Sequence, residues 1–161
     1  MYPTYASLAV TLHCNARCVH CDIWKNKFAE EAPASMYEKL PSSLRTIDIT
    51  GGEPFLRNDL PEVVGTIKKS CPDANLLITT HGFFHARIER LLPEIRAIDP
   101  DIAFRISLDG MEETHNRVRG LPNFFGRAMK SIDALQKGGV KNLGVIFSMM
   151  HENRAKNVMP F

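Results

Sequence analysis

Short apolar runs alternate with amphipathic stretches along most of the chain. The apolar runs are rich in aliphatic and β-branched residues, and each is bounded by polar or glycine-containing turns. This pattern is typical of strands. The predicted strands lie at positions 7–12, 46–50, 75–80, 102–108 and 143–149.

The stretches between these runs carry apolar residues at the spacing of a helix face. Ser35-Met36-Tyr37-Glu38 has the form of a capping box and predicts a short helix. Asp59 is placed to cap a second helix, and Pro93 is expected to interrupt a third. Asn123 is expected to cap a fourth helix, which ends at Gly138.

The alternation of strand and helix predicts an α/β fold with a parallel sheet, since a crossover through a helix returns the next strand parallel to the last. Five such units indicate an open, partial (βα) barrel of the TIM type. A long polar loop is expected to reach Asn123, and residues 151–158 are expected to begin a fifth helix. Functional side chains in such folds lie on the loops after the strands.

Composition narrows the class of protein. A chain of 161 residues with 44% hydrophobic residues fits one domain with a core of its own. The net charge is +2 and the basic residues are scattered, which disfavours nucleic acid as the main partner. The sequence contains no apolar run near the ~20 residues that span a bilayer, and its N-terminus does not resemble a signal peptide. These features predict a cytoplasmic protein.

Three of the four cysteines lie close together, with the spacing Cys14-x3-Cys18-x2-Cys21. Such a group in a reducing compartment indicates a metal site, and thiolates suit iron–sulfur clusters. Three cysteines leave one iron of a four-iron cluster without a protein ligand. That iron is open to a small chelator that offers an amine and a carboxylate.

The cysteines also allow two other interpretations. A structural zinc ion held by the three thiolates with His13 or His20 is the alternative to an iron–sulfur cluster. The fourth cysteine, Cys71, lies far from the others in sequence and is interpreted as a structural thiol.

The octapeptide Cys14-Asn15-Ala16-Arg17-Cys18-Val19-His20-Cys21 follows the first predicted strand and resembles the CxxxCxxC signature of the radical S-adenosylmethionine (SAM) superfamily. The resemblance covers about residues 7–158 and is to the branches that mature peptides and build cofactors. It implies a [4Fe–4S] cluster on Cys14, Cys18 and Cys21, with SAM on the open iron. His20 takes a position that is often aromatic in the family and is expected to contact the cofactors.

The tetrapeptide Gly51-Gly52-Glu53-Pro54 follows the second predicted strand. Two glycines let the backbone approach a ligand closely, and a carboxylate accepts a hydrogen bond from an ammonium group. Alone, the tetrapeptide is equally well an ordinary strand-to-helix turn. It resembles the GGE motif of the family, which implies that Gly51, Gly52 and Glu53 contact the SAM amino group.

Ser107-Leu108-Asp109-Gly110 ends the fourth predicted strand. The Ser107 hydroxyl is expected to bind a ribose or a carboxylate, whereas Asp109 is either a ligand or a turn residue bonded to its own backbone. The resemblance of residues 107–120 to the same branches implies that Arg119, rather than Arg117, holds the SAM carboxylate. A guanidinium group suits that bidentate contact.

Two further groups of residues are candidates. Thr79, Thr80 and His81 end the third predicted strand and are expected to face the methionine part of SAM or the substrate. Val145 and Ile146 either form an apolar wall for adenine or belong to the core.

The resemblance implies that the reduced cluster cleaves SAM to methionine and a 5′-deoxyadenosyl radical, which abstracts hydrogen from a peptide or small-molecule substrate. It implies a maturase-type oxidoreductase and a reducing partner such as a flavodoxin or ferredoxin. The family core usually has six βα units, so residues 1–161 are expected to form a core domain truncated before the sixth. The alternatives are a non-catalytic iron–sulfur or zinc module and an inactive fragment of a larger radical SAM protein.

Overall fold

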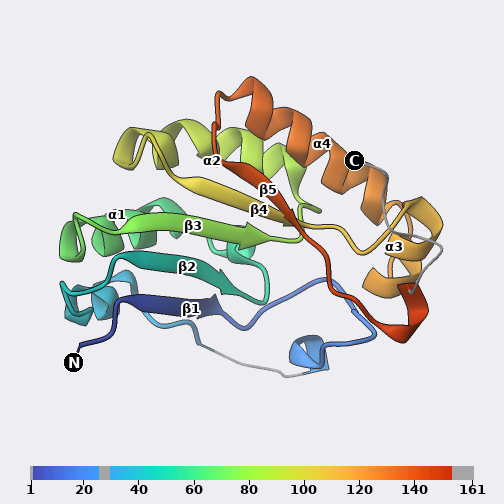
Figure 1. The fold of residues 1–161 in the computed structure, drawn as a ribbon, viewed down its shortest axis with the longest axis horizontal. Helices are drawn as coiled ribbons and strands as arrows, with labels where there is room; N and C mark the ends of the chain where they lie inside the picture. Colours follow the sequence, from blue (N-terminus) through green and yellow to red (C-terminus); the bar gives the residue numbers. More distant parts are fainter. Residues whose placement is uncertain (1, 26–29, 154–161) are drawn as a thin grey trace.

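The computed structural model describes residues 2–25 and 30–153. Five strands form one sheet in the order β1-β2-β3-β4-β5, and each pairs in parallel with the next. The predicted α/β fold with an open, partial barrel is therefore confirmed, and the strand arrows all point the same way (Figure 1). The strands span Tyr5–Thr11, Thr46–Gly51, Asn75–Thr80, Ala103–Ser107 and Leu143–Ile146.

Helices connect the strands, and their apolar faces pack on alternate strand residues such as Ile47, Ile78 and Phe104 to form the main core. Burying one such side chain contributes roughly 1.5–3 kcal/mol. The α-helices are α1 Leu60–Ser70, α2 His85–Ile98, α3 Glu112–Arg119 and α4 Phe124–Lys137, and the 3-10 helices are η1 Ile23–Lys25, η2 Ala34–Lys39, η3 Pro54–Leu56 and η4 His151–Asn153. None of the described helices is long and apolar enough to cross a membrane.

Pro93 does not interrupt the third helix as the sequence predicts, because α2 runs through it without a break. A proline inside a helix costs ~3 kcal/mol through a lost hydrogen bond and a steric clash. Ile88, Leu92 and Ile95 of the same helix are buried in the core. Their combined burial exceeds the cost of the proline at roughly 1.5–3 kcal/mol each, so the helix persists.

The polar loop expected before Asn123 contains a further helix, α3, so that prediction is wrong in this part. Few apolar residues mark α3 as a helix, because the face that it buries is mainly polar. Acidic residues in its first turn and basic ones in its last complement the helix dipole. Gly120 ends it in the left-handed conformation, with φ 72°. Arg119 therefore lies in the last turn of a helix rather than in a loop.

Three predicted helix starts differ in detail. Asn123 precedes α4 as expected, but its side chain makes no cap hydrogen bond and its backbone is left-handed, with φ 58°. The segment at Ser35 forms the 3-10 helix η2 without a side-chain cap. Ala34 and Tyr37, three residues apart, are the buried pair, and that spacing matches a 3-10 turn. Asp59 precedes α1 as expected, but its carboxylate binds the Arg57 guanidinium at 2.9 and 2.6 Å instead of capping the helix.

The last two predicted elements are shorter than expected. The fifth strand, predicted to reach residue 149, ends at Ile146 in the structure. Of the helix expected at 151–158, the described part is η4, and the remainder lies outside the described residues. The cysteine loop, α3 and the segment after β5 gather beyond the arrowheads of the strands (Figure 1). This is the edge at which a parallel sheet carries its functional loops.

Candidate cofactor site

A cavity of about 130 Å³ opens at the carboxyl ends of the strands. The three clustered cysteines line it together with residues from the ends of β2, β3 and β4 and from the last turn of α3. Thr79, Thr80 and His81 are among its lining residues, and their contact with SAM or the substrate stays a prediction. Of the predicted cofactor residues, the cavity brings together Cys14, Cys18, Cys21, His20, Gly51, Gly52, Ser107 and Arg119.

The cysteine loop is held against the end of α3 by main-chain hydrogen bonds. The amide of Arg17 donates to the carbonyl of Arg119 at 3.0 Å, and that of Val19 donates to the carbonyl of Val118 at 3.0 Å. Gly120 permits this approach, because a Cβ there would lie 2.6 Å from the Arg17 carbonyl oxygen. The backbone of the loop is therefore fixed on both sides of Cys18.

The thiols of the loop are largely shielded from water. Burial raises the pKa of Cys14 to about 12 and also raises the pKa of Cys18, which Arg119 partly offsets. The Arg119 Nη1 lies 3.6 Å from the Cys18 Sγ. The raised pKa values of Cys14 and Cys18 favour their neutral thiols in the absence of a metal, so metal binding must displace those protons.

The arrangement of the thiols distinguishes an iron–sulfur cluster from a zinc ion. Within residues 2–25 and 30–153, no three His, Cys, Asp or Glu side chains converge on a point that one metal ion would occupy. A structural zinc needs four ligands at about 2.0–2.3 Å from one centre. A cubane cluster places each thiolate on a different iron, so it needs thiols that line one cavity. Cys14, Cys18 and Cys21 meet the second requirement.

The two glycines after β2 allow close contact with the loop after β1. A Cβ at Gly51, where φ is 128°, would lie 2.2 Å from the Thr11 carbonyl oxygen, and one at Gly52 would lie 2.1 Å from that of His13. The amide of Gly52 donates to the Thr11 carbonyl at 2.7 Å. These glycines thus pack backbone on backbone beneath the cysteine loop while they also line the cavity.

The carboxylate of Glu53 is fully buried and bound to protein donors. Its Oε1 accepts hydrogen bonds from the Phe55 amide at 3.0 Å and the Thr80 hydroxyl at 2.7 Å, and its Oε2 accepts one from the His81 amide at 3.0 Å. Glu53 is not among the residues that line the cavity. In this structure it joins the ends of β2 and β3, and its contact with the SAM amino group stays a prediction.

His81 links this carboxylate to the cysteine loop. Its Nδ1 lies 3.0 Å from Glu53 Oε2 and 3.1 Å from the Phe83 amide, and its Nε2 lies 2.9 Å from Asn15 Oδ1. Burial lowers the pKa of His81, which favours the neutral ring. With Nδ1 accepting from Phe83, the Nε2–H donates to Asn15. The sequence does not reveal this contact, because 66 residues separate the two partners.

Asp109 connects the ends of β4, α3 and the segment after β5. Its Oδ2 lies 2.7 Å from Arg119 Nη2, and its Oδ1 accepts a hydrogen bond from the Ser148 amide at 3.1 Å. Its own amide donates to His115 Nδ1 at 3.0 Å, and its carbonyl accepts from Asn153 Nδ2 at 3.0 Å. Asp109 is thus neither a cavity residue nor a simple turn residue, but it positions Arg119 beside the cavity.

Three other candidates lie away from the cavity. Ile146 is 38% exposed and is not a lining residue. Val145 borders a separate groove beside Ile132 of α4. Cys71 is buried at the end of α1, where its thiol donates to the Pro41 carbonyl at 3.5 Å.

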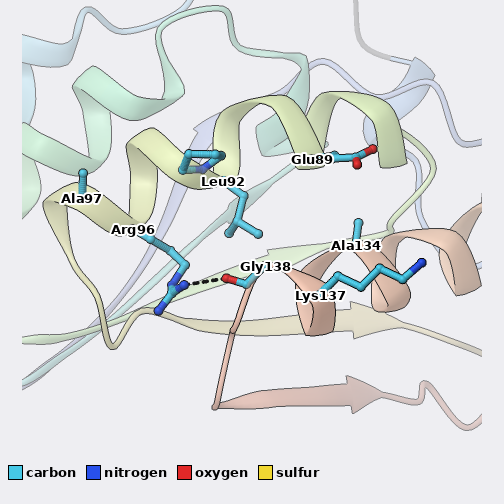
Figure 2. A pocket seen from close by; sticks show the side chains of 8 residues that line it. Glu89, Leu92, Arg96, Ala97, Ala134, Lys137 and Gly138 are labelled. Atoms are coloured by element: carbon cyan, nitrogen blue, oxygen red, sulfur yellow. Dashed lines mark hydrogen bonds between the residues drawn. The ribbon is translucent and has the colours of Figure 1, made fainter.

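A larger groove of about 560 Å³ lies between α2 and α4, on the helical side of the molecule (Figure 2). The Arg96 guanidinium crosses it and donates to the Gly138 carbonyl. The other side chains of the groove include Glu89, Leu92 and Lys137. It contains none of the cysteines or strand-end residues, so we assign the chemistry to the smaller cavity.

Comparison with curated proteins shows sequence relatives with a known activity. The Fe-coproporphyrin III synthase of Methanosarcina barkeri is 29% identical over 151 residues, which cover 89% of this chain and 36% of that protein. A GTP 3′,8-cyclase of Sulfurimonas denitrificans is 28% identical over 181 residues, covering 93% of this chain and 56% of that protein. The chain thus spans about a third to just over half of the length of these relatives.

Comparison with solved structures supports the fold. Native anSMEcpe with bound AdoMet matches with a TM-score of 0.66 at 17% identity, over 88% of this chain and 42% of that one. A second structure of that protein also holds a Kp18Cys peptide and matches with a TM-score of 0.64 at 18% identity, over 88% of this chain and 42% of that one. The model of the radical SAM superfamily matches residues 8–156, so the chain belongs to that superfamily, whose cofactors are a [4Fe–4S] cluster and SAM.

Proposed function

We propose that this chain is the cofactor-binding core of a maturase-type radical SAM enzyme that abstracts hydrogen from a peptide or small-molecule substrate. One observation carries the proposal. Three thiols and a buried guanidinium group line a single cavity at the carboxyl ends of the strands. Three thiolates and one cation are the groups that an incompletely ligated cluster and an anionic chelator require.

The residues of the cavity take separate roles in this proposal. Cys14, Cys18 and Cys21 each hold one iron, which leaves the fourth open to SAM. Arg119 binds the SAM carboxylate, since its Nη2 is fixed by Asp109 and its Nε has no protein partner among the described residues. The backbone of Gly51 and Gly52 is placed for the amino group, and the hydroxyl of Ser107 for the ribose or the carboxylate.

When bound, the reduced cluster supplies one electron to the SAM sulfonium, so that the C5′–S bond breaks into methionine and a 5′-deoxyadenosyl radical. The chain contributes orientation and a dry environment for that step. The side chains of Phe83, Leu121 and Phe124 pack with Cys14, Cys18 and Cys21 in one apolar cluster. Exclusion of water there protects a reactive radical from side reactions.

Two observations support the proposed substrate class. The resemblance is to branches that mature peptides and build cofactors, and one structural neighbour was solved with a peptide bound. The electron donor in this proposal is a flavodoxin or ferredoxin. We place the protein in the cytoplasm, because its four cysteines are free thiols and that compartment keeps thiols reduced.

The proposal is tested by anaerobic reconstitution of the full-length protein, followed by assays of iron, sulfide and 5′-deoxyadenosine after reduction with dithionite. We expect four irons and four sulfides for each cluster, and 5′-deoxyadenosine formation that Cys18→Ser removes. Cys71→Ser is the matched control, because its thiol lies outside the cavity. A cluster that binds SAM but never cleaves it would contradict the catalytic proposal.

A further inference from the structure

The two faces of the sheet differ in polarity. Parallel sheets that are buried on both faces are apolar on both. Here the face away from the helices is largely polar along β2, β3 and β4, although the opposite face packs into the core. The strand residues of this face between Thr46 and Ser107 include Thr46, Asp48, Thr50, Leu77, Thr79, Arg105 and Ser107.

This polar face extends from the cofactor cavity toward the amino ends of the strands. Thr50, Thr79 and Ser107 line the cavity from three adjacent strands. Asp48 lies two residues before Thr50 on β2, so its side chain projects from the same face. A direct contact confirms this placement, because the Thr79 hydroxyl donates to Asp48 Oδ1 at 2.7 Å. The Asp48 carboxylate thus lies next to the cavity, on the side nearer the amino ends of the strands.

Asp48 is available to a ligand. It is only partly buried, and within the described chain its Oδ2 accepts no hydrogen bond from a protein donor. A carboxylate in a partly enclosed cavity binds an ammonium group or another hydrogen-bond donor.

Arg105 provides the opposite charge on the same face. It pairs with Thr79 on one side and Gly144 on the other. Its Nη1 donates to the carbonyls of Phe104 at 2.8 Å and Asn142 at 3.3 Å, which leaves Nε and Nη2 without a partner among the described residues. A Cβ at Gly144 would lie 3.0 Å from Arg105 Nε, so this glycine provides the space for the guanidinium group.

We propose that this face binds a zwitterionic, amino-acid-derived substrate, with its ammonium group on Asp48 and its carboxylate on Arg105. The inference rests on the proposed function and names the substrate class of that site. Neighbouring strands are ~4.8 Å apart, so two strand spacings and the stagger place the Cα atoms of these two residues roughly 10–12 Å apart. An extended tripeptide of ~10 Å spans this distance with its two charged ends.

The same charges disfavour a nucleoside triphosphate. A triphosphate needs several cations near its oxygens, whereas the described residues of this face present a carboxylate below the cavity and one guanidinium group that is partly used by backbone carbonyls. The GTP 3′,8-cyclase relative acts on such a nucleotide according to its name. We therefore expect this chain to differ from that relative in its substrate.

The test uses the full chain, loaded with its cluster and SAM, and four probes: triglycine, N-acetyltriglycine, triglycine amide and GTP. Binding is followed by the NMR shifts of amides on β2 to β4. We expect triglycine to bind at least tenfold more tightly than either blocked peptide. Asp48→Asn should remove the discrimination against the acetylated peptide alone, and Arg105→Gln should remove the discrimination against the amide alone.

Two control variants distinguish a specific effect at Asp48 or Arg105 from a general effect of removing a charge. Asp73→Asn and Arg90→Gln change exposed charges far from this face and should leave all four affinities unchanged. Equal affinity for free and blocked peptides, no saturable shift with triglycine, or tighter binding of GTP would overturn the inference. SAM affinity and iron content are measured on the same samples. An unmutated chain that holds no iron–sulfur cluster or binds no SAM would overturn the proposed function instead.

Discussion

His81 and Asn15 join the third strand to the cysteine loop, with His81 Nε2 2.9 Å from Asn15 Oδ1. The imidazole is buried and its Nδ1 accepts a hydrogen bond from the Phe83 amide, while the backbone amide of His81 donates to Glu53, whose carboxylate also accepts from Thr80. The ends of β2 and β3 thus fix the position of a loop that follows β1. A loop with few apolar residues gains its rigidity from such buried polar contacts.

The first prediction concerns this link. His81→Ala removes the ring that orients Asn15, so we expect a chelator to strip the reconstituted cluster several-fold faster than from the unmutated protein. The rate is followed by the loss of the cluster absorption. His151→Ala, at an exposed position, is the control. An unchanged rate in a folded His81→Ala variant would show that the link does not hold the loop.

The second prediction concerns the contact between Gly120 and the cysteine loop. Gly120→Ala forces a side chain into the left-handed region and against the Arg17 carbonyl, at a cost of about 1–3 kcal/mol in the free energy of unfolding. Gly126→Ala is the matched control, because it lies in α4 with no atom within 4 Å of the added Cβ. It should stabilise the chain by up to ~1 kcal/mol through helix propensity. Urea unfolding measures both, and similar values would contradict the prediction.

The third prediction concerns SAM binding by Arg119. Arg119→Lys keeps a positive charge near Asp109 but loses the planar pair of donors, so we expect SAM affinity to fall about tenfold while the cluster remains. Isothermal titration with reconstituted protein measures the affinity. Arg117→Lys should change it less than twofold. A larger effect at Arg117 would reverse the assignment of the carboxylate ligand.

The fourth prediction concerns pH. Burial lowers the pKa of His115 to about 3, whereas an unfolded histidine titrates near 6.5. Between these two values only the unfolded chain binds the proton, so stability falls as the pH drops through 6.5 and this loss ends near pH 3. The difference amounts to about 1–2 kcal/mol between pH 7 and pH 5.

His115→Gln tests this prediction, because the glutamine oxygen can still accept the hydrogen bond from Asp109. Urea unfolding of the cluster-free chain at pH 7 and at pH 5 should show a smaller loss of stability in the variant than in the unmutated chain. Equal losses in both would contradict the assignment.

The strand pattern and the motifs could be predicted from the sequence because both are local. The third strand falls at the predicted residues, and α4 begins after Asn123 and ends before Gly138 as expected. The CxxxCxxC spacing likewise identified the three thiols that line the cavity. Spacing within one loop and the periodicity of apolar residues depend on neighbouring positions alone.

Features that depend on tertiary contacts could not be predicted in the same way. The helix α3 buries Thr114, His115 and Arg119, so its inward face is polar and gives no apolar period. Glu53 was expected at the ligand, yet its partners on β3 arise only when the two strands pair. The helix α2 continues through Pro93 because of its packing on the core, and the sequence around the proline does not show that packing.

Mössbauer spectroscopy of anaerobically reconstituted protein, with and without SAM, reports the identity of the metal centre. We expect one [4Fe–4S] cluster in which SAM shifts the signal of a single iron, and no intact cluster in Cys14→Ser. A fully protein-ligated cluster that SAM leaves unchanged, or a zinc ion without sulfide, would contradict this expectation.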